Sequence, residues 1–355
     1  MPPCTNISRS RCHWRAMSER RLRIAQVAPI GTPVRPGVGE SVESLVAALC
    51  DRLTQRGHDV TLFATGDSRT AATLRSVYAR GYEEDHSMWD WALAEGLHAA
   101  EAFVQPDAFD VIHCHTHYGL PSAAVSRTPV VQTHHMEMGP ELVSALRRCD
   151  WIHVVAVSEH QAADLAGRRN LSVIPHGVDV DAFPFTPHAG PYLMFLGRMI
   201  ADKGPVQAAQ IARTAGLPLI LAGPPEDGFE EHIRPALTGP GIEYVGRVEP
   251  PERDRLLAGA AALLYPIQYP EPFGLVAIEA MACGTPVLAT PVGAAPELID
   301  VGLTGHVAGT VADLAALVPA ALGLDRGRVR ARARERFDIS AMVDRHEALY
   351  QRVAA

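Results

Sequence analysis

The sequence predicts an α/β protein with two domains, each built around a parallel β-sheet. The chain has 355 residues, which exceeds one typical domain and suits two of about 150 to 180 residues. Short apolar segments alternate with segments whose apolar residues recur at helical spacing, a pattern typical of parallel strands joined by crossover helices. Residues 183–190, rich in Pro and punctuated by Gly, read as the interdomain linker.

Composition excludes several classes of function. The hydrophobic content of 47% and the charged content of 20% are ordinary for a globular protein. A net charge of −8 argues against a nucleic-acid partner, because neutralising phosphates requires a basic surface. No run of 18 or more apolar residues occurs, so we expect no membrane span and at most peripheral membrane contact. Six cysteines without a CxxC pair indicate a reducing, cytoplasmic compartment, and no pattern fixes the oligomeric state.

The first 17 residues differ from the rest of the chain. They are polar, carry Arg9, Arg11 and Arg15, and lack the apolar segment of a secretory signal. We therefore expect residues 1–17 to form a disordered tail, and Met17 is a second candidate start.

The first domain opens with an expected strand at residues 22–29, a loop, a helix at residues 40–56 and a strand at residues 59–64. The loop contains Gly37-Val-Gly39 just before the helix. Small residues at a helix N-terminus let backbone N–H groups approach a phosphate, so this loop is a candidate anion site. It lacks the third glycine and the following acidic residue of a dinucleotide fingerprint.

Beyond a helical stretch at residues 88–103, histidines gather where further strands end. The strands are expected at residues 111–115, 130–133, 152–157 and 172–174, and the histidines are His113, His115, His117, His134, His135 and His176. One interpretation is a metal-dependent hydrolase, because His-x-His leaving a strand is a spacing that zinc sites use. Another is that His113, His115 and His117 are hydrogen-bonded core residues. No downstream Asp or Lys pattern completes a metal site.

The second domain begins with a strand at residues 192–197, followed by Arg198 and Lys203. A guanidinium and an ammonium just beyond a strand can neutralise a diphosphate. Further strands are expected at residues 219–222, 242–245, 260–265 and 287–289, and a terminal helix at residues 342–353.

The segment from Tyr269 to Thr290 places two carboxylates at an unusual spacing. Pro272 keeps Glu271 outside the following helix, whereas Glu279 lies inside it. If all of the segment were helical, the two would be about 12 Å apart, more than the roughly 5 to 9.5 Å of a glycosidase pair. The spacing suits two carboxylates that hold different parts of a long ligand, beside helix-start N–H groups that favour an anion. A nucleotide sugar has that shape.

This segment resembles the Glu-x7-Glu signature of the retaining GT-B glycosyltransferases of family 4 (GT4), including the flanking Pro-Phe-Gly-Leu and the later Pro296-Glu297. Gly197-Arg198 with Lys203-Gly204 resembles that family's Gly-Arg-x4-Lys-Gly motif. In the first domain, Asp110-Val-Ile-His113 and the strand end leading to His135 are also similar. His176 stands where the family usually has Asn. The resemblance covers residues 22–355.

The resemblance implies a GT-B fold, in which two Rossmann-like β/α/β domains with parallel sheets face each other across a cleft. The acceptor domain would comprise residues 18–183 plus the C-terminal helix, about residues 340–355, and the nucleotide-sugar domain residues 184–339. The activity implied is hexosyl transfer with retention of anomeric configuration, without a metal or other cofactor.

Family roles carry over residue by residue. The implied catalytic residues are Glu271 and His135, which face the donor sugar, and Arg198 and Lys203, which clamp the diphosphate. Glu279 would hold the ribose. The remaining donor-binding candidates are Gly37, Val38, Gly39, Gly197, Val248, Phe273, Gly274 and Leu275.

The substrates are less well defined than the site. Similarity of the second half to short bacterial GT4 glucosyltransferases favours UDP-glucose as donor and a small-molecule acceptor. The acceptor-side candidates are His117, Tyr118, Met136 and His176. We expect Trp89 and Trp91 to pack in the core. Two alternatives share the architecture: a UDP-sugar 2-epimerase, which needs no acceptor, and a non-catalytic nucleotide-sugar-binding protein.

Overall fold

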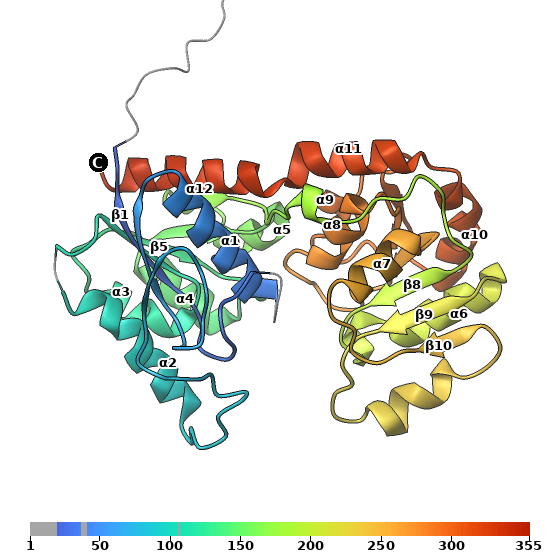
Figure 1. Cartoon of the computed structure of the whole chain (residues 1–355), viewed down its shortest axis with the longest axis horizontal. Helices are drawn as coiled ribbons and strands as arrows, with labels where there is room; N and C mark the ends of the chain where they lie inside the picture. Colours follow the sequence, from blue (N-terminus) through green and yellow to red (C-terminus); the bar gives the residue numbers. More distant parts are fainter. Residues whose placement is uncertain (1–19, 37–40, 106) are drawn as a thin grey trace, which may run out of the picture.

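A computed structural model describes residues 20–36, 41–105 and 107–355 (Figure 1). The expected tail at residues 1–17 and the loop residues Gly37, Val38 and Gly39 lie outside the described residues. The chain forms two lobes, each with one parallel sheet covered by helices (Figure 1). The predicted α/β class and GT-B architecture are confirmed.

The first sheet has seven strands in the order β3-β2-β1-β4-β5-β6-β7, and every pairing is parallel. The strands are β1 Arg23–Val27, β2 Asp59–Phe63, β3 Thr73–Arg75, β4 Val111–Cys114, β5 Val130–Thr133, β6 His153–Ala156 and β7 Leu171–Val173. Strand β3 was not predicted from the sequence, because this short edge strand has a single apolar residue, Leu74.

The second sheet has six parallel strands in the order β10-β9-β8-β11-β12-β13. They are β8 Leu193–Leu196, β9 Leu219–Ala222, β10 Ile242–Tyr244, β11 Ala262–Tyr265, β12 Val287–Ala289 and β13 Gly305–Val307. In both sheets the strand order reverses beside the first strand of the domain, and ligands of such sheets bind at the carboxyl ends of the strands near that point.

Helices cover the sheets and cross between the lobes. Their bounds are α1 Ser41–Gln55, α2 Trp91–Ala100, α3 Leu120–Ala123, α4 Pro140–Arg148, α5 Glu159–Ala162, α6 Pro205–Ala215, α7 Glu252–Gly259, α8 Leu275–Ala282, α9 Ala295–Leu298, α10 Val311–Leu322, α11 Arg326–Phe337 and α12 Ile339–Val353. Within the described ranges, none of these helices is long and apolar enough to cross a lipid bilayer.

The segment around Val178 and the segment that joins α11 to α12 run side by side where the lobes meet. The Val178 N–H donates to Phe337 O at 2.9 Å, and the Ile339 N–H donates to Val178 O at 3.0 Å. A Cβ at Gly177 would lie 2.9 Å from Ile339 Cα, so only glycine allows this close approach. Figure 1 shows α11 on the second lobe continuing into α12 along the first.

Helix α12 is part of the first lobe's core. Tyr350 is fully buried, and its hydroxyl lies 2.6 Å from His113 Nδ1 and accepts from Gln26 Nε2 at 3.1 Å. Glu347 bonds to His58 Nε2 at 2.7 Å and pairs with Arg56. The last helix therefore completes the domain formed by the first part of the chain.

Replacing Tyr350 tests this attachment. We expect Tyr350→Ala to destabilise the first lobe by about 3 to 5 kcal/mol through the cavity it leaves, and Tyr350→Phe by about 1 to 3 kcal/mol through the unpaired His113 and Gln26. Urea unfolding followed by circular dichroism measures both. Arg345→Ala, an exposed position on the same helix, is the control and should change stability by less than about 0.5 kcal/mol. Equal midpoints for Tyr350→Ala and the control would contradict the packing.

Candidate active site

Glu271 lies in a loop between β11 and α8, where two side chains fix its carboxylate. Lys203 Nζ is 2.6 Å from Oε1, and the Tyr265 hydroxyl donates to Oε2 at 2.6 Å. Lys203 also donates to the Tyr269 hydroxyl at 3.0 Å. Burial, and secondly the Glu271 charge, hold the pKa of Tyr265 well above its usual value, so this phenol remains a donor. The carboxylate is thus oriented and its charge is balanced before any ligand binds.

The backbone of this loop is fixed as tightly as the side chain. Ala294 N–H donates to Glu271 O at 3.0 Å. Gly293 has φ +60°, and a Cβ there would lie 2.4 Å from Glu271 O, so a side chain would displace the loop. The close approach of the two backbone segments therefore requires glycine at position 293.

Helix α8 starts directly after the loop and presents its N-terminus beside Glu271. Gly274 precedes the helix with φ +110°, and a Cβ there would lie 2.4 Å from the Tyr265 hydroxyl oxygen. The first N–H groups of a helix have no carbonyl partner within it, which favours an anion near Phe273, Gly274 and Leu275. Three of the predicted donor-binding residues, Phe273, Gly274 and Leu275, thus lie at the start of one helix.

Glu279 lies one turn further along α8 and is half-buried. Burial raises its pKa, and Arg253, whose Nη2 lies 3.8 Å from Oε1, opposes that shift. A partly desolvated carboxylate with free hydrogen-bonding capacity is suited to accept from hydroxyl groups.

Arg198 follows β8 on the same edge of the second sheet, and its side chain is half exposed. It pairs with Glu226 at 3.0 Å, so it does not share the partner of Lys203. Its neighbour Gly197 lies against Gly223, where a Cβ would be 1.8 Å from Gly197 O. Val248 is half-buried and packs against the second lobe's core.

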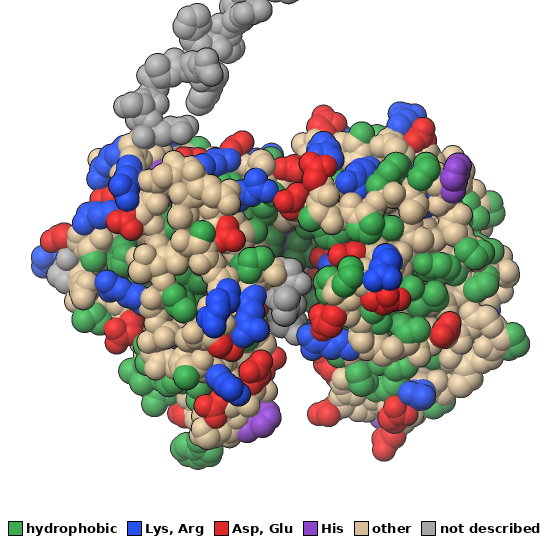
Figure 2. All heavy atoms as spheres, viewed as in Figure 1, with side chains coloured by type: hydrophobic (Ala, Val, Ile, Leu, Met, Phe, Trp, Pro, Cys, Tyr) green, Lys and Arg blue, Asp and Glu red, His purple; other side chains and the backbone are tan. Residues whose placement is uncertain are grey.

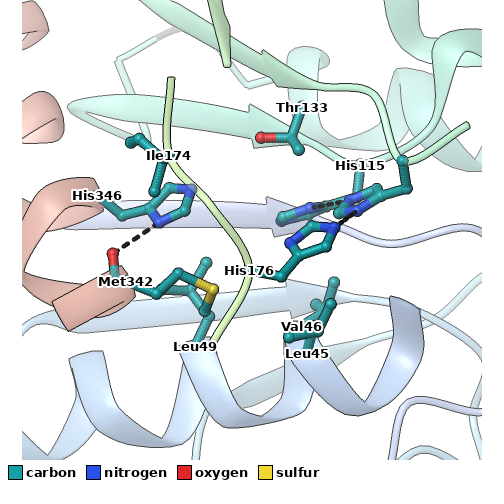
Figure 3. A pocket seen from close by; sticks show the side chains of 10 residues that line it. Leu45, Val46, Leu49, His115, Thr133, Ile174, His176, Met342 and His346 are labelled. Carbon is teal, nitrogen blue, oxygen red and sulfur yellow. Dashed lines mark hydrogen bonds between the residues drawn. The ribbon is translucent and has the colours of Figure 1, made fainter. Parts of the chain in front are cut away.

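In the first lobe, a hydrogen-bonded chain runs through the predicted catalytic histidine. His115 Nε2 lies 2.8 Å from Gln26 Oε1, and His115 Nδ1 lies 3.0 Å from His135 Nε2. His135 Nδ1 is 3.4 Å from His176 Nε2. Figure 3 shows His115 and His176 together over Leu45 and Val46 of α1.

The direction of the protons in this chain follows from its first member. Gln26 Nε2 donates to Tyr350, so Gln26 Oε1 is an acceptor and His115 carries its proton on Nε2. His115 Nδ1 then accepts from His135 Nε2–H, and His135 Nδ1 accepts from His176. His135 is therefore held neutral with its Nδ1 lone pair toward His176.

Burial keeps these imidazoles uncharged. It lowers the pKa of His115 and of His176 to about 3, and that of His135 falls well below its usual value, with neighbouring His176 as the second cause. His113 is buried between Tyr350 and Thr133 Oγ1, with its Nε2 2.7 Å from that oxygen. It is a structural residue, as the second interpretation of the histidines predicted.

Two contacts bring the lobes together at this site. The rings of His176 and Phe273 meet edge to face with centroids 5.0 Å apart. The Glu297 carboxylate of α9 accepts from the backbone N–H of Glu159 at 2.8 Å and of His160 at 2.6 Å, capping α5 of the other lobe. Figure 2 shows the groove between the lobes.

Two of the acceptor-side candidates are in contact: the rings of His117 and Tyr118 lie tilted to each other with centroids 4.2 Å apart. Met136 is 62% exposed. The expectation that Trp89 and Trp91 pack in the core is wrong, since they are 96% and 44% exposed. Trp89 lies before α2 and Trp91 on its first turn, where the helical apolar pattern does not imply burial.

Sequence reasoning missed several residues that shape the site. They are Gln26, Tyr265, Arg253, His346 and Tyr350. Glu297 was identified as part of a family motif, but no role was predicted for it. Tyr265 ends a predicted strand six residues before Glu271, which was an available signal. Gln26 and Tyr350 had none, because they meet only in the fold.

The histidine cluster does not have the arrangement of a metal site. Among residues 20–36, 41–105 and 107–355, no group of three or more His, Cys, Asp or Glu could hold a metal ion. Ring nitrogens of His115 and His135 instead bond to each other.

The fold and this cleft define a GT-B protein, and comparison with known proteins gives the family. The model "Glycosyltransferase Family 4" matches residues 42–182, and "Glycosyl transferases group 1" matches residues 181–336. The "D-inositol 3-phosphate glycosyltransferase" of Nocardiopsis dassonvillei is 29% identical, covering 80% of this chain and 82% of its own. The "Glycogen synthase" of Mycobacterium tuberculosis is 31% identical over 69% of this chain and 61% of its own.

Comparison with solved structures finds glycosyltransferases of the same fold. AviGT4, "a glycosyltransferase involved in Avilamycin A biosynthesis", is 26% identical and superposes with a TM-score of 0.73, covering 94% of this chain and 98% of its own. The sucrose-phosphate synthase from Thermosynechococcus elongatus, 19% identical, matches in fold with a TM-score of 0.74, covering 93% of this chain and 98% of its own. The chain belongs to the GT4 glycosyltransferases.

The buried histidines predict acid instability. Histidines with pKa values lowered by burial are His98, His113, His115, His117, His134, His135, His153, His176 and His346. The unfolded chain protonates them below about pH 6.5 while the fold does not, so stability falls as pH drops from there towards 4, by up to about 1.4 kcal/mol per pH unit for each histidine. Glu95, whose pKa is raised to about 7, acts in the opposite direction.

Urea midpoints between pH 8 and 5 measure this dependence. His346→Phe should make it shallower, whereas His188→Phe, at an exposed position, should leave it unchanged. A midpoint that is constant over this range would contradict the neutral, buried state of the histidines.

Proposed function

We propose that this glycosyltransferase moves a hexose from a nucleotide sugar, with UDP-glucose as the first candidate, to a small-molecule acceptor with retention of configuration. The observation that carries the proposal is the carboxylate of Glu271, held between Lys203 Nζ and the Tyr265 hydroxyl at 2.6 Å each. A fixed carboxylate with an ammonium beside it can meet both charges that develop when a sugar leaves a diphosphate.

The donor would lie along the second lobe's edge. Lys203 and Arg198, with the N-terminus of α8, would take up the diphosphate, and Glu279 would accept from the ribose hydroxyls. These cationic groups and helix dipoles supply the positive charge that a metal would otherwise bring, so we propose a metal-independent reaction. Val248 and Gly197 would border the nucleotide.

In the transfer step, the bond between the anomeric carbon and the diphosphate oxygen breaks, and its electron pair leaves on the diphosphate. The acceptor oxygen bonds to the same face of that carbon, and its proton passes to the departing phosphate oxygen. Glu271 would stabilise the positive charge on the sugar ring. Neutral His135, oriented by His115, would contact the donor sugar through its Nδ1 after that atom exchanges its hydrogen bond from His176 for one from the sugar.

Substitutions in the ion pair test this assignment. Glu271→Gln and Lys203→Ala should each lower kcat by about 100-fold or more, because each removes charge stabilisation made in the transition state. Transfer is followed as UDP release from UDP-glucose with an acceptor panel. Glu230→Gln, in an exposed ion pair with Arg234, is the matched control and should retain full activity. Full activity of Lys203→Ala would contradict the proposal.

Incubating donors without acceptor separates the alternatives. A transferase should show at most slow hydrolysis, whereas conversion of a UDP-sugar to its epimer would identify a 2-epimerase. Among UDP- and GDP-sugars, UDP-glucose should raise the melting temperature most. Binding without turnover under every acceptor would indicate a non-catalytic protein.

A further inference from the structure

Glu297 contacts the other lobe, and no step of the proposed transfer uses it. It lies in α9, which Figure 1 shows beside α5 where the lobes meet. One oxygen of its carboxylate accepts from the Glu159 N–H at 2.8 Å, and the other accepts from the His160 N–H at 2.6 Å. Hydrogen bonds to an ionised carboxylate are shorter and stronger than neutral ones, and both weaken steeply when bent. The two bonds therefore fix α9 and α5 in distance and in direction.

On the second lobe, Glu297 is joined through the backbone to the loop of Glu271. The Glu297 N–H donates to Ala294 O at 2.9 Å, and the Ala294 N–H donates to Glu271 O at 3.0 Å. Arg336 of α11 donates to Glu297 O at 2.5 Å and to Leu298 O at 3.1 Å, which ties the end of α9 to α11. Glu271 and Glu297 thus belong to one hydrogen-bonded unit.

On the first lobe, α5 holds the backbone on both sides of His135. Gln161 of α5 directly follows His160 in the sequence, and it is 2% exposed. Its Nε2 donates to His134 O at 3.1 Å and to Met136 O at 2.8 Å. Its Oε1 accepts from the Val157 N–H at 2.9 Å. One buried amide group therefore places the loop that carries His135.

We propose that Glu297 is a positioning residue, which sets His135 against Glu271 across the cleft so that a donor sugar is held between them. This inference rests on the proposed transferase function. The path runs from Glu271 through Ala294 and Glu297 to α5, and from Gln161 to the His135 loop. None of its hydrogen bonds between these segments is longer than 3.1 Å.

The effect of such a contact is on geometry. Glu297 acts through the backbone of two loops, so its removal would shift His135 relative to Glu271 while leaving both side chains in place. A misplacement of about 1 Å between reacting groups can lower a rate by about 100-fold, even when the change lies far from the chemistry. The proposal gives a role to the Pro296-Glu297 motif, which the donor site does not explain.

Amide hydrogen exchange of the full chain, followed by NMR, tests the contact without substrate. Glu297→Ala should speed exchange of the Glu159 and His160 N–H groups by at least about tenfold, because both lose their acceptor. Glu335→Ala, which removes an exposed carboxylate paired with Arg332 in the same lobe, is the matched control and should leave these rates unchanged.

Two further N–H groups report whether the change reaches the His135 loop. The Gln161 N–H donates to Ser158 Oγ at 3.0 Å, and the Val157 N–H donates to the Gln161 side chain. Both should exchange faster in Glu297→Ala, because α5 and the Gln161 amide group lose their fixed place.

A double-mutant cycle with His135→Ala tests the positioning role by kinetics. UDP release from UDP-glucose is measured with enzyme in excess and with the acceptor that the wild type uses fastest. Glu297→Ala should lower the transfer rate by about 10- to 100-fold in the wild-type chain, but by less than about twofold in His135→Ala, because residues that act as a unit are not additive. Glu297→Gln keeps one accepting oxygen and should lose less. The affinity for UDP, which has no sugar to place, should be unchanged in all variants.

Unchanged exchange of the four N–H groups in Glu297→Ala would overturn the proposal, and so would full activity of that variant. Equal losses in the two backgrounds would also overturn it, because Glu297 would then act without His135. If the wild type turns over no donor, the transferase proposal fails by itself. Exchange at Gln161 and Val157 then decides whether Glu297 places the His135 loop.

Discussion

The contact between Lys203 and Glu271 is the interaction on which the rest of the site depends. This ion pair at 2.6 Å, with both side chains about one-sixth exposed, is supported by further hydrogen bonds, from Tyr265 to Glu271 and from Lys203 to Tyr269. The pair ties the turn after β8 to the loop after β11, two neighbouring strands of the second sheet. The loop continues into α8, so one ion pair sets the relation between the Glu271 carboxylate, the Lys203 ammonium and a helix N-terminus.

In the first lobe, the histidines of the candidate site are kept neutral. Burial is combined there with a fixed direction of hydrogen bonds from Gln26 through His115 to His135. The terminal helix takes part, because Tyr350 orients Gln26. The crossover of the chain at Val178 therefore does more than connect the lobes, since it brings a C-terminal residue under an N-terminal site.

Much of the fold was predictable from the sequence, and the failures have separate physical causes. Buried parallel strands are continuous apolar runs, and Glu271, Arg198 and Lys203 follow strand ends at motif spacing, so the second lobe's site could be placed. Gln26 and Tyr350 lie 324 positions apart, and no local pattern links residues that meet only after the chain crosses back. Trp91 was misassigned because apolar content, without knowledge of which helix face is covered, does not distinguish a core residue from an exposed aromatic site.

We propose a retaining transfer of glucose across this cleft, with the carboxylate of Glu271 facing the sugar from one side. The most direct measurement is the anomeric configuration of the product, read from the proton NMR coupling of the transferred sugar while UDP-glucose is consumed. We predict an α-linked product, the configuration of the donor. A β-linked product would contradict the proposed same-face reaction.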